Sequence, residues 1–219
     1  MNVLGADHHG YVARLRALVS GFGFPPEGLR VLLVQLVNLT RGGEAVRMGK
    51  RAGEFVTLRE VLDEVGTDAA RFFFLLRKAD SQLDFDLALA KQQSADNPVF
   101  YVQYAHARIA SVLRQATEAG IAIVPAPDLG PLGEAEIEVL RTVASFPDVV
   151  EAAARELEPH RVVFYALELA GAFHRYYNRH RILTDGPALT QARLAVVRCV
   201  QQVLRSALDL AGIGAPERM

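Results

Sequence analysis

The sequence predicts a mainly α-helical fold, in which a partial Rossmann-like βαβ unit is followed by an all-helical bundle. Two patterns lead to this prediction. Residues 1–39 alternate between apolar runs and one helical stretch, whereas the chain from Thr57 onward carries the periodicity of amphipathic helices. The 219 residues are 51% hydrophobic, which is enough for one large domain or for a small domain beside a helical one.

The N-terminal elements are expected in the order strand, helix, strand. Residues 1–5 should form a buried strand, residues 9–21 a helix, and residues 31–39 an apolar strand that is long for the centre of a parallel sheet. Apolar side chains line one side of that helix: Val12, Leu15 and Leu18. One βαβ unit has too little sheet to be stable alone, so we expect it to be the end of a doubly wound domain.

Capping signals divide the rest of the chain into helices. Thr57 and Glu60 have the spacing of a capping box, and Gly66 is suited to end the helix that they begin. Asp68 is expected to start the next helix, and a third should begin around Phe85. The later helices are expected at 98–120, 133–157, 158–181 and 188–211, with a proline-containing loop at 121–132.

The composition narrows the function classes. With 24 Lys and Arg against 25 Asp and Glu, the chain is not expected to coat nucleic acid in general, and any RNA contact must come from local patches. The single Cys199 allows no intramolecular disulfide and is expected to be a small buried residue in a reducing compartment. Neither a membrane span nor a signal peptide is predicted. We expect a cytoplasmic monomer that binds no DNA and no membrane.

The first motif is Gly5-Ala6-Asp7-His8-His9-Gly10, where the first strand gives way to a helix. Small residues at such a turn let the backbone approach a ligand, and the Asp7 carboxylate can accept hydrogen bonds from ribose hydroxyls. Adjacent histidines on a turn point in different directions and no third ligand is suitably spaced, so no metal site is predicted. A turn without a ligand is the alternative.

The second motif is Arg47-Met48-Gly49-Lys50-Arg51-Ala52-Gly53, a loop with glycines and cations that suits phosphate oxygens. A solvated basic turn that contacts no nucleotide is the alternative. Together, a nucleotide-binding turn and a phosphate-binding loop on one chain would suit the two ends of a nucleotide.

The helical half contains interleaved aromatic and basic residues. Tyr104 and Arg108 lie one helical turn apart, as do Phe173 and Tyr177, and residues 175–181 form the densest such cluster. Unpaired RNA bases stack on aromatic rings and arginine side chains bind backbone phosphates, so this pattern indicates RNA binding. The alternative for each residue is that the ring packs in the core and the arginine is only solvated.

Long stretches of the chain resemble bacterial arginyl-tRNA synthetases, a class I family. The resemblance is carried by GADHHGYV, VLLVQLVNLTRGGEAVRMGKRAGEFVTL, DEVGTDAARFFFLLRKADSQLDFDLALAKQQSADNPVFYVQYAHARI and the final APERM. It implies that residues 1–56 are the C-terminal part of a catalytic domain, that 57–93 are a helical connection, and that 94–219 are a helical DALR-type anticodon-binding domain.

The resemblance also implies roles for individual residues. The ATP site would include Gly5, Asp7, His8, His9, Gly10, Met48, Gly49 and Lys50. Lys50 is expected to neutralise the leaving pyrophosphate with help from Arg51, which makes these two the candidate catalytic residues. Arg47 stands where the family has a lysine, and Gly49 where a serine is more usual.

The predicted RNA contacts combine the family resemblance with the aromatic and basic pattern. The family places the tyrosines of the VQYAHAR helix and the terminal methionine near the anticodon, and the cluster around 175–181 adds further candidates. The predicted tRNA-binding residues are Tyr101, Tyr104, Arg108, Tyr176, Tyr177, Arg179 and Met219.

The activity that the resemblance implies is arginine–tRNA ligation, in which ATP and L-arginine give arginyl-adenylate and the arginyl group then passes to tRNA(Arg). Mg²⁺ would accompany the ATP. The sequence contains no His-x-Gly-His signature of the kind that class I enzymes also need, so the chain alone is expected to be inactive. The alternatives are a non-catalytic stand-alone or split tRNA-binding protein, and a nucleotide-binding helical protein unrelated to RNA.

Overall fold

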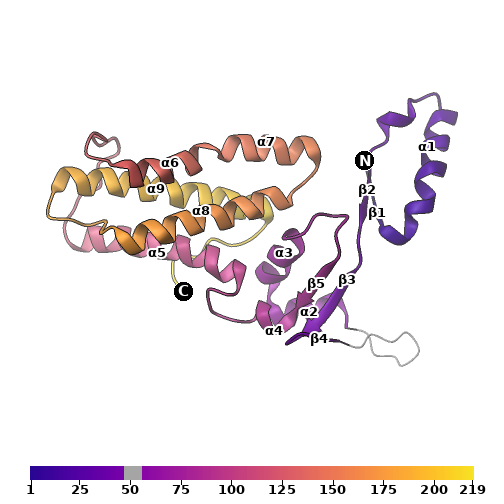
Figure 1. Cartoon of the computed structure of the whole chain (residues 1–219), viewed down its shortest axis with the longest axis horizontal. Helices are drawn as coiled ribbons and strands as arrows, with labels where there is room; N and C mark the ends of the chain where they lie inside the picture. The colour runs from indigo at the N-terminus through magenta and orange to yellow at the C-terminus, as the bar shows by residue number, and fades with distance from the viewer. Residues whose placement is uncertain (47–55) are drawn as a thin grey trace.

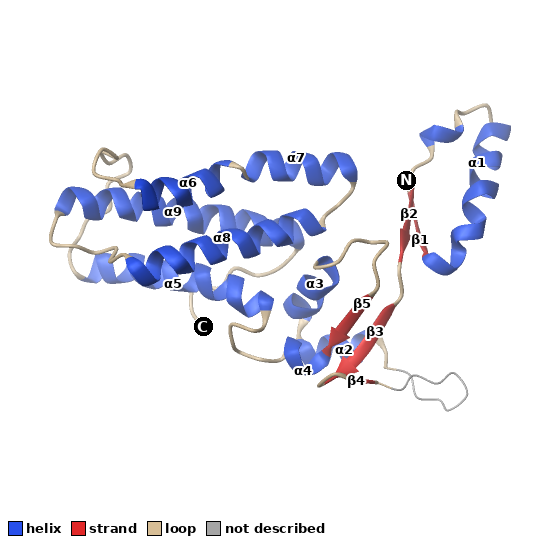
Figure 2. Ribbon diagram, in the orientation of Figure 1, coloured by secondary structure: helices blue, strands red, loops and turns tan. Residues whose placement is uncertain are grey.

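A computed structural model describes residues 1–46 and 56–219. The chain runs from a βαβ unit through a small α/β part into a long helical bundle (Figure 1). The strands are β1 (Asn2–Gly5), β2 (Val31–Val34), β3 (Val37–Arg41), β4 (Glu44–Ala45) and β5 (Leu83–Asp86). The helices are the 3-10 helices η1 (Ala6–Tyr11) and η2 (Pro26–Gly28), then α1 (Val12–Gly21), α2 (Leu58–Val65), α3 (Thr67–Leu75), α4 (Leu87–Ala90), α5 (Pro98–Glu118), α6 (Glu134–Ala144), α7 (Phe146–Glu156), α8 (His160–Arg179) and α9 (Pro187–Ala211). The mainly α-helical prediction is confirmed (Figure 2).

The predicted βαβ unit is present, but its strands are not buried. β1 and β2 pair in parallel, from Asn2 opposite Val31 to Gly5 opposite Val34, with α1 between them in the chain. Val3 is 58% exposed, so the expectation of a buried first strand was wrong. The reason is that a sheet of two strands leaves its faces and outer edges open within the described residues.

The apolar run 31–39 does not form one long strand. It is divided between β2 and β3, which belong to different sheets. At the division, the backbone N–H of Gln35 donates a hydrogen bond to the carbonyl of Ala79 at 2.7 Å. The polar Gln35 therefore marks the point at which the chain leaves the βαβ unit and enters the second sheet.

The prediction that the chain is helical throughout after Thr57 was wrong at Leu83–Asp86. This segment is β5, which pairs in parallel with β3, while β4 pairs with β3 on its other side (Figure 2). Leu83 and Phe85 are buried and Asp84 between them is exposed, which is the period of a strand. The third helix therefore begins as α4 at Leu87, and the sheet crosses the predicted boundary between residues 56 and 57.

The capping signals of α2 were read correctly. The backbone N–H of Glu60 donates to Thr57 Oγ1 at 3.2 Å, and the backbone N–H of Thr57 donates back to Glu60 Oε2 at 2.6 Å. Gly66 ends the helix with a φ of 83°, a conformation that favours glycine.

The C-terminal bundle consists of α5 to α9, with α8 and α9 packed along α5 and α6 (Figure 1). Its core includes the fully buried side chains of Ile109, Phe173 and Leu204. The single helix expected at 133–157 is divided into α6 and α7, with Pro147 in the first turn of α7, where the missing N–H is tolerated. Cys199 on α9 is exposed, which corrects the expectation of a buried residue.

In the part of the chain that the structure describes, we find no helix with the length and apolar character needed to span a membrane.

Candidate nucleic-acid interface

Arg108 lies at the centre of an aromatic and basic face built by α5 and α8. Its guanidinium carbon is 4.5 Å from the ring centroid of Tyr104 and 4.9 Å from that of Tyr177. The same guanidinium donates a hydrogen bond to the Tyr104 hydroxyl at 2.9 Å. Sequence spacing placed Tyr104 and Arg108 one turn apart, and the bundle adds Tyr177 from the neighbouring helix. The cation therefore joins two rings from different helices.

His174 supports Arg108 from the interior of the bundle. Arg108 Nη1 donates to His174 Nδ1 at 3.3 Å, and His174 Nε2 donates to the carbonyl of Tyr101 at 3.2 Å. Burial lowers the pKa of His174 and the charge of Arg108 lowers it further, while the bond to Tyr101 acts in the opposite direction. The neutral imidazole is therefore favoured, and its free lone pair can accept from Arg108.

The tyrosines of this face differ in exposure. Tyr104 is 37% exposed, and its ring is nearly parallel to that of Phe100, with 5.9 Å between centroids and 12° between planes. Tyr101 and Tyr177 are half-buried, and each contacts a neighbour of Tyr104: Tyr101 meets His174, and Tyr177 meets Arg108. Tyr104 is thus the most exposed of these tyrosines, and a base could stack on the part of its ring that Arg108, Phe100 and His174 leave open.

Tyr176 lies inside the bundle. It is 4% exposed, and its hydroxyl donates to Glu136 Oε1 at 2.9 Å. Glu136 also accepts from Arg193 Nε at 2.8 Å and from the backbone N–H of Gly133 at 3.0 Å. Burial and the neighbouring Glu136 carboxylate raise the pKa of Tyr176. In this conformation the ring has no free face for a base, so Tyr176 is expected to stabilise the bundle rather than to contact RNA.

Two exposed arginines lie farther along α8 and line a hollow between α8 and α6, together with Ala135 and Glu138. Arg175 and Arg179 are exposed and lie one helical turn apart. A Cβ built on Gly171 would lie 3.3 Å from Arg175 Nη1 and 3.6 Å from the Tyr101 hydroxyl. The glycine therefore lets both side chains lie close against α8, which places a cation beside the aromatic rings.

A cavity of about 730 Å³ opens beside this face and is lined by Met219. Phe100 and Gln103 of α5 form one wall, and residues of α2, α3 and the segment after α4 form the others. Met219 is 53% exposed. The cavity combines an apolar side chain, an aromatic ring and amide groups with the charged side chains of Glu64, Asp68 and Lys91. The ring and the amides suit a splayed base.

Three parts of this face were not predicted from the sequence: Phe100, His174 and Gly171. Phe100 precedes Tyr104 by four residues, and this spacing was a usable signal. His174 and Gly171 act through contacts across the bundle, which a single helical pattern does not reveal.

The nucleotide-binding candidates lie together at the end of β1, in η1. Gly5 ends β1, and Asp7, His8 and His9 follow on the surface. The Asp7 and His8 side chains approach to 3.6 Å. A Cβ on Gly5 would lie only 2.5 Å from Asp7 Oδ1, so a larger residue at position 5 would displace this carboxylate. Among residues 1–46 and 56–219, no group of three His, Cys, Asp or Glu side chains is placed to hold a metal ion.

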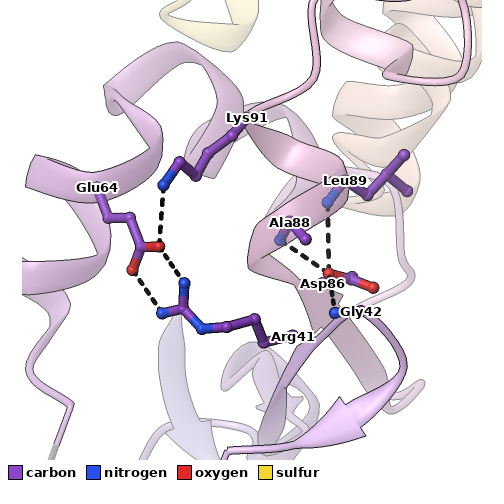
Figure 3. A network of polar contacts seen from close by, with 7 residues as sticks. All are labelled: Arg41, Gly42, Glu64, Asp86, Ala88, Leu89 and Lys91. Carbon is purple, nitrogen blue, oxygen red and sulfur yellow. Dashed lines mark hydrogen bonds and ion pairs between the residues drawn. The ribbon is translucent and has the colours of Figure 1, made fainter.

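The candidates Met48, Gly49, Lys50 and Arg51, with Arg47, lie outside the described residues. The structure does describe the strand and turn before them. Asp86 Oδ1 accepts from the backbone N–H groups of Gly42, Ala88 and Leu89, at 3.1, 2.8 and 3.3 Å (Figure 3). Burial tends to raise the pKa of Asp86, but these backbone donors outweigh it and lower the pKa. One carboxylate thus caps α4 and holds the β3–β4 turn.

An ion pair attaches the same hairpin to α2. Arg41 at the end of β3 donates to both carboxylate oxygens of Glu64, at 2.6 and 2.9 Å (Figure 3). Lys91 Nζ donates to Glu64 Oε1 at 3.3 Å. Since β4 ends at Ala45 and α2 begins at Leu58, this network fixes the elements on both sides of the undescribed segment.

Known proteins resemble this chain along its whole length. The sequence profile of the DALR anticodon binding domain matches residues 102–219. Proteins called arginine–tRNA ligase from Syntrophotalea carbinolica and Desulfitobacterium hafniense are 56% and 52% identical over all of this chain, which spans 40% of their length.

Solved structures agree with the sequence relatives. The putative arginyl-tRNA synthetase of Campylobacter jejuni superposes with a TM-score of 0.89 at 32% identity, covering 100% of this chain and 47% of that one. The arginyl-tRNA synthetase of Thermus thermophilus gives 0.83 at 29% identity, covering 100% and 40%.

Proposed function

Because the chain belongs to the family of proteins with a DALR anticodon binding domain, we propose that its helical bundle binds the anticodon loop of tRNA(Arg), as part of an arginine–tRNA ligase. The observation that carries this proposal is the face of α5 and α8, where Arg108 holds the rings of Tyr104 and Tyr177. Rigid aromatic planes next to cations are what a single-stranded RNA loop requires.

Within the bundle, each group has a distinct role. A loop base stacks on the open part of the Tyr104 ring, and Tyr101 and Tyr177 support the neighbours of that ring. Arg108 fixes the rings, while Arg179 reaches a backbone phosphate. Met219 contacts a second, splayed base in the adjacent cavity. These contacts position the RNA loop and require no proton transfer.

The N-terminal motifs are proposed to complete an ATP site in the longer protein. Because Gly5 has no Cβ, it leaves room for the Asp7 carboxylate, which is suited to accept hydrogen bonds from ribose hydroxyls. His8, His9 and Gly10 line the same turn. Met48, Gly49, Lys50 and Arg51 belong to the phosphate side, where Lys50 and Arg51 stabilise charge on the leaving pyrophosphate. ATP, bound with Mg²⁺, supplies the phosphorus that the carboxylate of L-arginine attacks.

The chain alone is proposed to bind RNA without forming arginyl-adenylate, because it contains no His-x-Gly-His signature. An ATP–pyrophosphate exchange assay with L-arginine tests this directly, and robust arginine-dependent exchange by the 219-residue chain would overturn it. The ligase to which the chain contributes is proposed to act as a monomer in the cytoplasm, where tRNA is charged.

Binding to a synthetic anticodon stem-loop tests the proposed RNA function. We expect the chain to bind the stem-loop of tRNA(Arg) more tightly than the same stem with an unrelated loop, and to lose affinity as salt increases. Equal affinity for both hairpins at every salt concentration would leave only non-specific charge attraction and would reject the anticodon role.

A further inference from the structure

The C-terminal tail, residues 212–219, is fastened to α3 and α5 by a series of hydrogen bonds. The backbone N–H of Gly214 donates to Asp68 Oδ2 at 3.1 Å, and the carbonyl of Gly214 accepts from Gln103 Nε2 at 2.9 Å. Gln103 Nε2 also donates to the same Asp68 oxygen at 2.9 Å. Two side chains that already bond each other thus hold Gly214 through both its backbone N–H and its carbonyl.

His106 makes the next contact along the tail. Its Nδ1 lies 2.8 Å from the carbonyl oxygen of Pro216. A carbonyl only accepts, so Nδ1 carries the hydrogen and His106 is the donor. The side chain is fully buried, and its Nε2 has no hydrogen-bond partner in the part of the chain that the structure describes. Among the described residues, the hydrogen bond to Pro216 of the tail is therefore the polar contact of this buried imidazole.

Two arginines fasten the tail at its last turn before Met219. Arg114 Nη1 donates to the carbonyl of Glu217 at 3.1 Å, and Arg205 Nη2 pairs with the Glu217 carboxylate at 3.3 Å. Met219 follows two residues later and lines the cavity together with Phe100 and Gln103. The polar contacts therefore end where the exposed methionine begins.

We propose that His106 is a positioning residue, which holds the tail through the carbonyl of Pro216 and so presents the Met219 side chain to RNA in a fixed place. The inference rests on the proposed RNA function, because it assigns His106 the task of preparing one of its contacts. A tail ordered before binding loses less conformational freedom when RNA arrives, so the contact is stronger than one made by a loose tail.

Three variants separate this role from simple packing. His106→Leu keeps an apolar side chain and removes the donor to Pro216. His106→Asn places an amide N–H near the position of imidazole Nδ1 and should restore the bond. Arg141→Ala is the matched control, because it removes an exposed ion pair with Glu134 on α6 and no contact with the tail.

The first measurement is hydrogen exchange of the tail amides in the full chain without RNA. His106→Leu should speed exchange at 213–219 by about tenfold, while His106→Asn and Arg141→Ala should stay within about threefold of the original chain. Unchanged exchange in His106→Leu, or equal exchange in the Leu and Asn variants, overturns the proposal.

The second measurement is a double-mutant cycle with the anticodon stem-loop. His106→Leu and Met219→Ala should each weaken binding by about fivefold, and the double variant should bind as the weaker single variant does, because both changes remove one contact. Losses that multiply would show independent roles and contradict the proposal. If the original chain does not bind the stem-loop at all, the proposed function fails, while the exchange measurement still decides whether His106 holds the tail.

Discussion

Arg108 lies over the ring of Tyr104, with 4.5 Å between the guanidinium carbon and the ring centroid, and also donates to the hydroxyl of that ring at 2.9 Å. A single cation thus holds the tyrosine at its face and at its tip. Two such contacts restrict rotation of the ring, so a base that stacks on Tyr104 meets a plane that is already ordered.

Tyr104→Ala is expected to weaken binding of the anticodon stem-loop by about 1–3 kcal/mol, because it removes the stacking plane. Tyr104→Phe should lose less, since it keeps the ring and removes only the hydroxyl bond. Phe164→Ala is the matched control: Phe164 is an exposed aromatic residue of α8, near His160 and outside the face. Fluorescence anisotropy with labelled RNA measures all three, and an equal loss in the control would argue against a specific stacking site.

Arg179→Ala is expected to weaken RNA binding and to reduce the slope of log affinity against log salt by about one, because one phosphate contact is lost. Arg161→Ala on the same helix removes an exposed arginine that pairs with Glu158, and it should leave the slope unchanged. A titration series from low to high salt provides both slopes. An unaltered slope in Arg179→Ala would mean that this side chain meets no phosphate.

Tyr176→Phe is expected to lower the free energy of unfolding without changing RNA affinity. The hydroxyl donates to the carboxylate of Glu136 in the core, and a hydrogen bond to a charged group contributes about 1.5–3 kcal/mol. Urea unfolding and stem-loop binding on the same sample measure the two effects. A loss of affinity with unchanged stability would return Tyr176 to the RNA interface.

Acid is expected to destabilise the fold already below about pH 6.5. Burial lowers the pKa of His106, His160 and His174 in the folded chain, whereas unfolded histidine titrates near 6.5. Between these pKa values the unfolded chain binds more protons, so the free energy of unfolding falls as the pH falls. Denaturation at pH 7.5, 6.5 and 5.5 checks this, and constant stability over that range would contradict the lowered pKa values.

Local patterns were the most reliable part of the sequence analysis. The capping box of Thr57 and Glu60 and the long helix α5 were predicted because their signals lie within a few residues of chain. Tyr104 and Arg108 were paired for the same reason. What failed depended on distant partners: Leu83–Asp86 forms a strand because β3 lies beside it.

The site was predicted only in part for a similar physical reason. A helical pattern identifies which residues share a face, but it does not say whether a neighbouring helix covers that face. Tyr176 and Tyr177 are adjacent in the sequence, yet α6 provides Glu136 as a partner for the first and leaves the second beside Arg108. Only the packing of the bundle distinguishes them.

Footprinting on intact tRNA(Arg) shows whether the α5–α8 face binds the anticodon loop. Backbone cleavage of end-labelled tRNA is compared with and without the chain, and with Tyr104→Ala as the matched variant. We expect the chain to protect the anticodon loop and the variant to protect it less. Protection confined to other parts of the tRNA, or identical protection by both proteins, would contradict it.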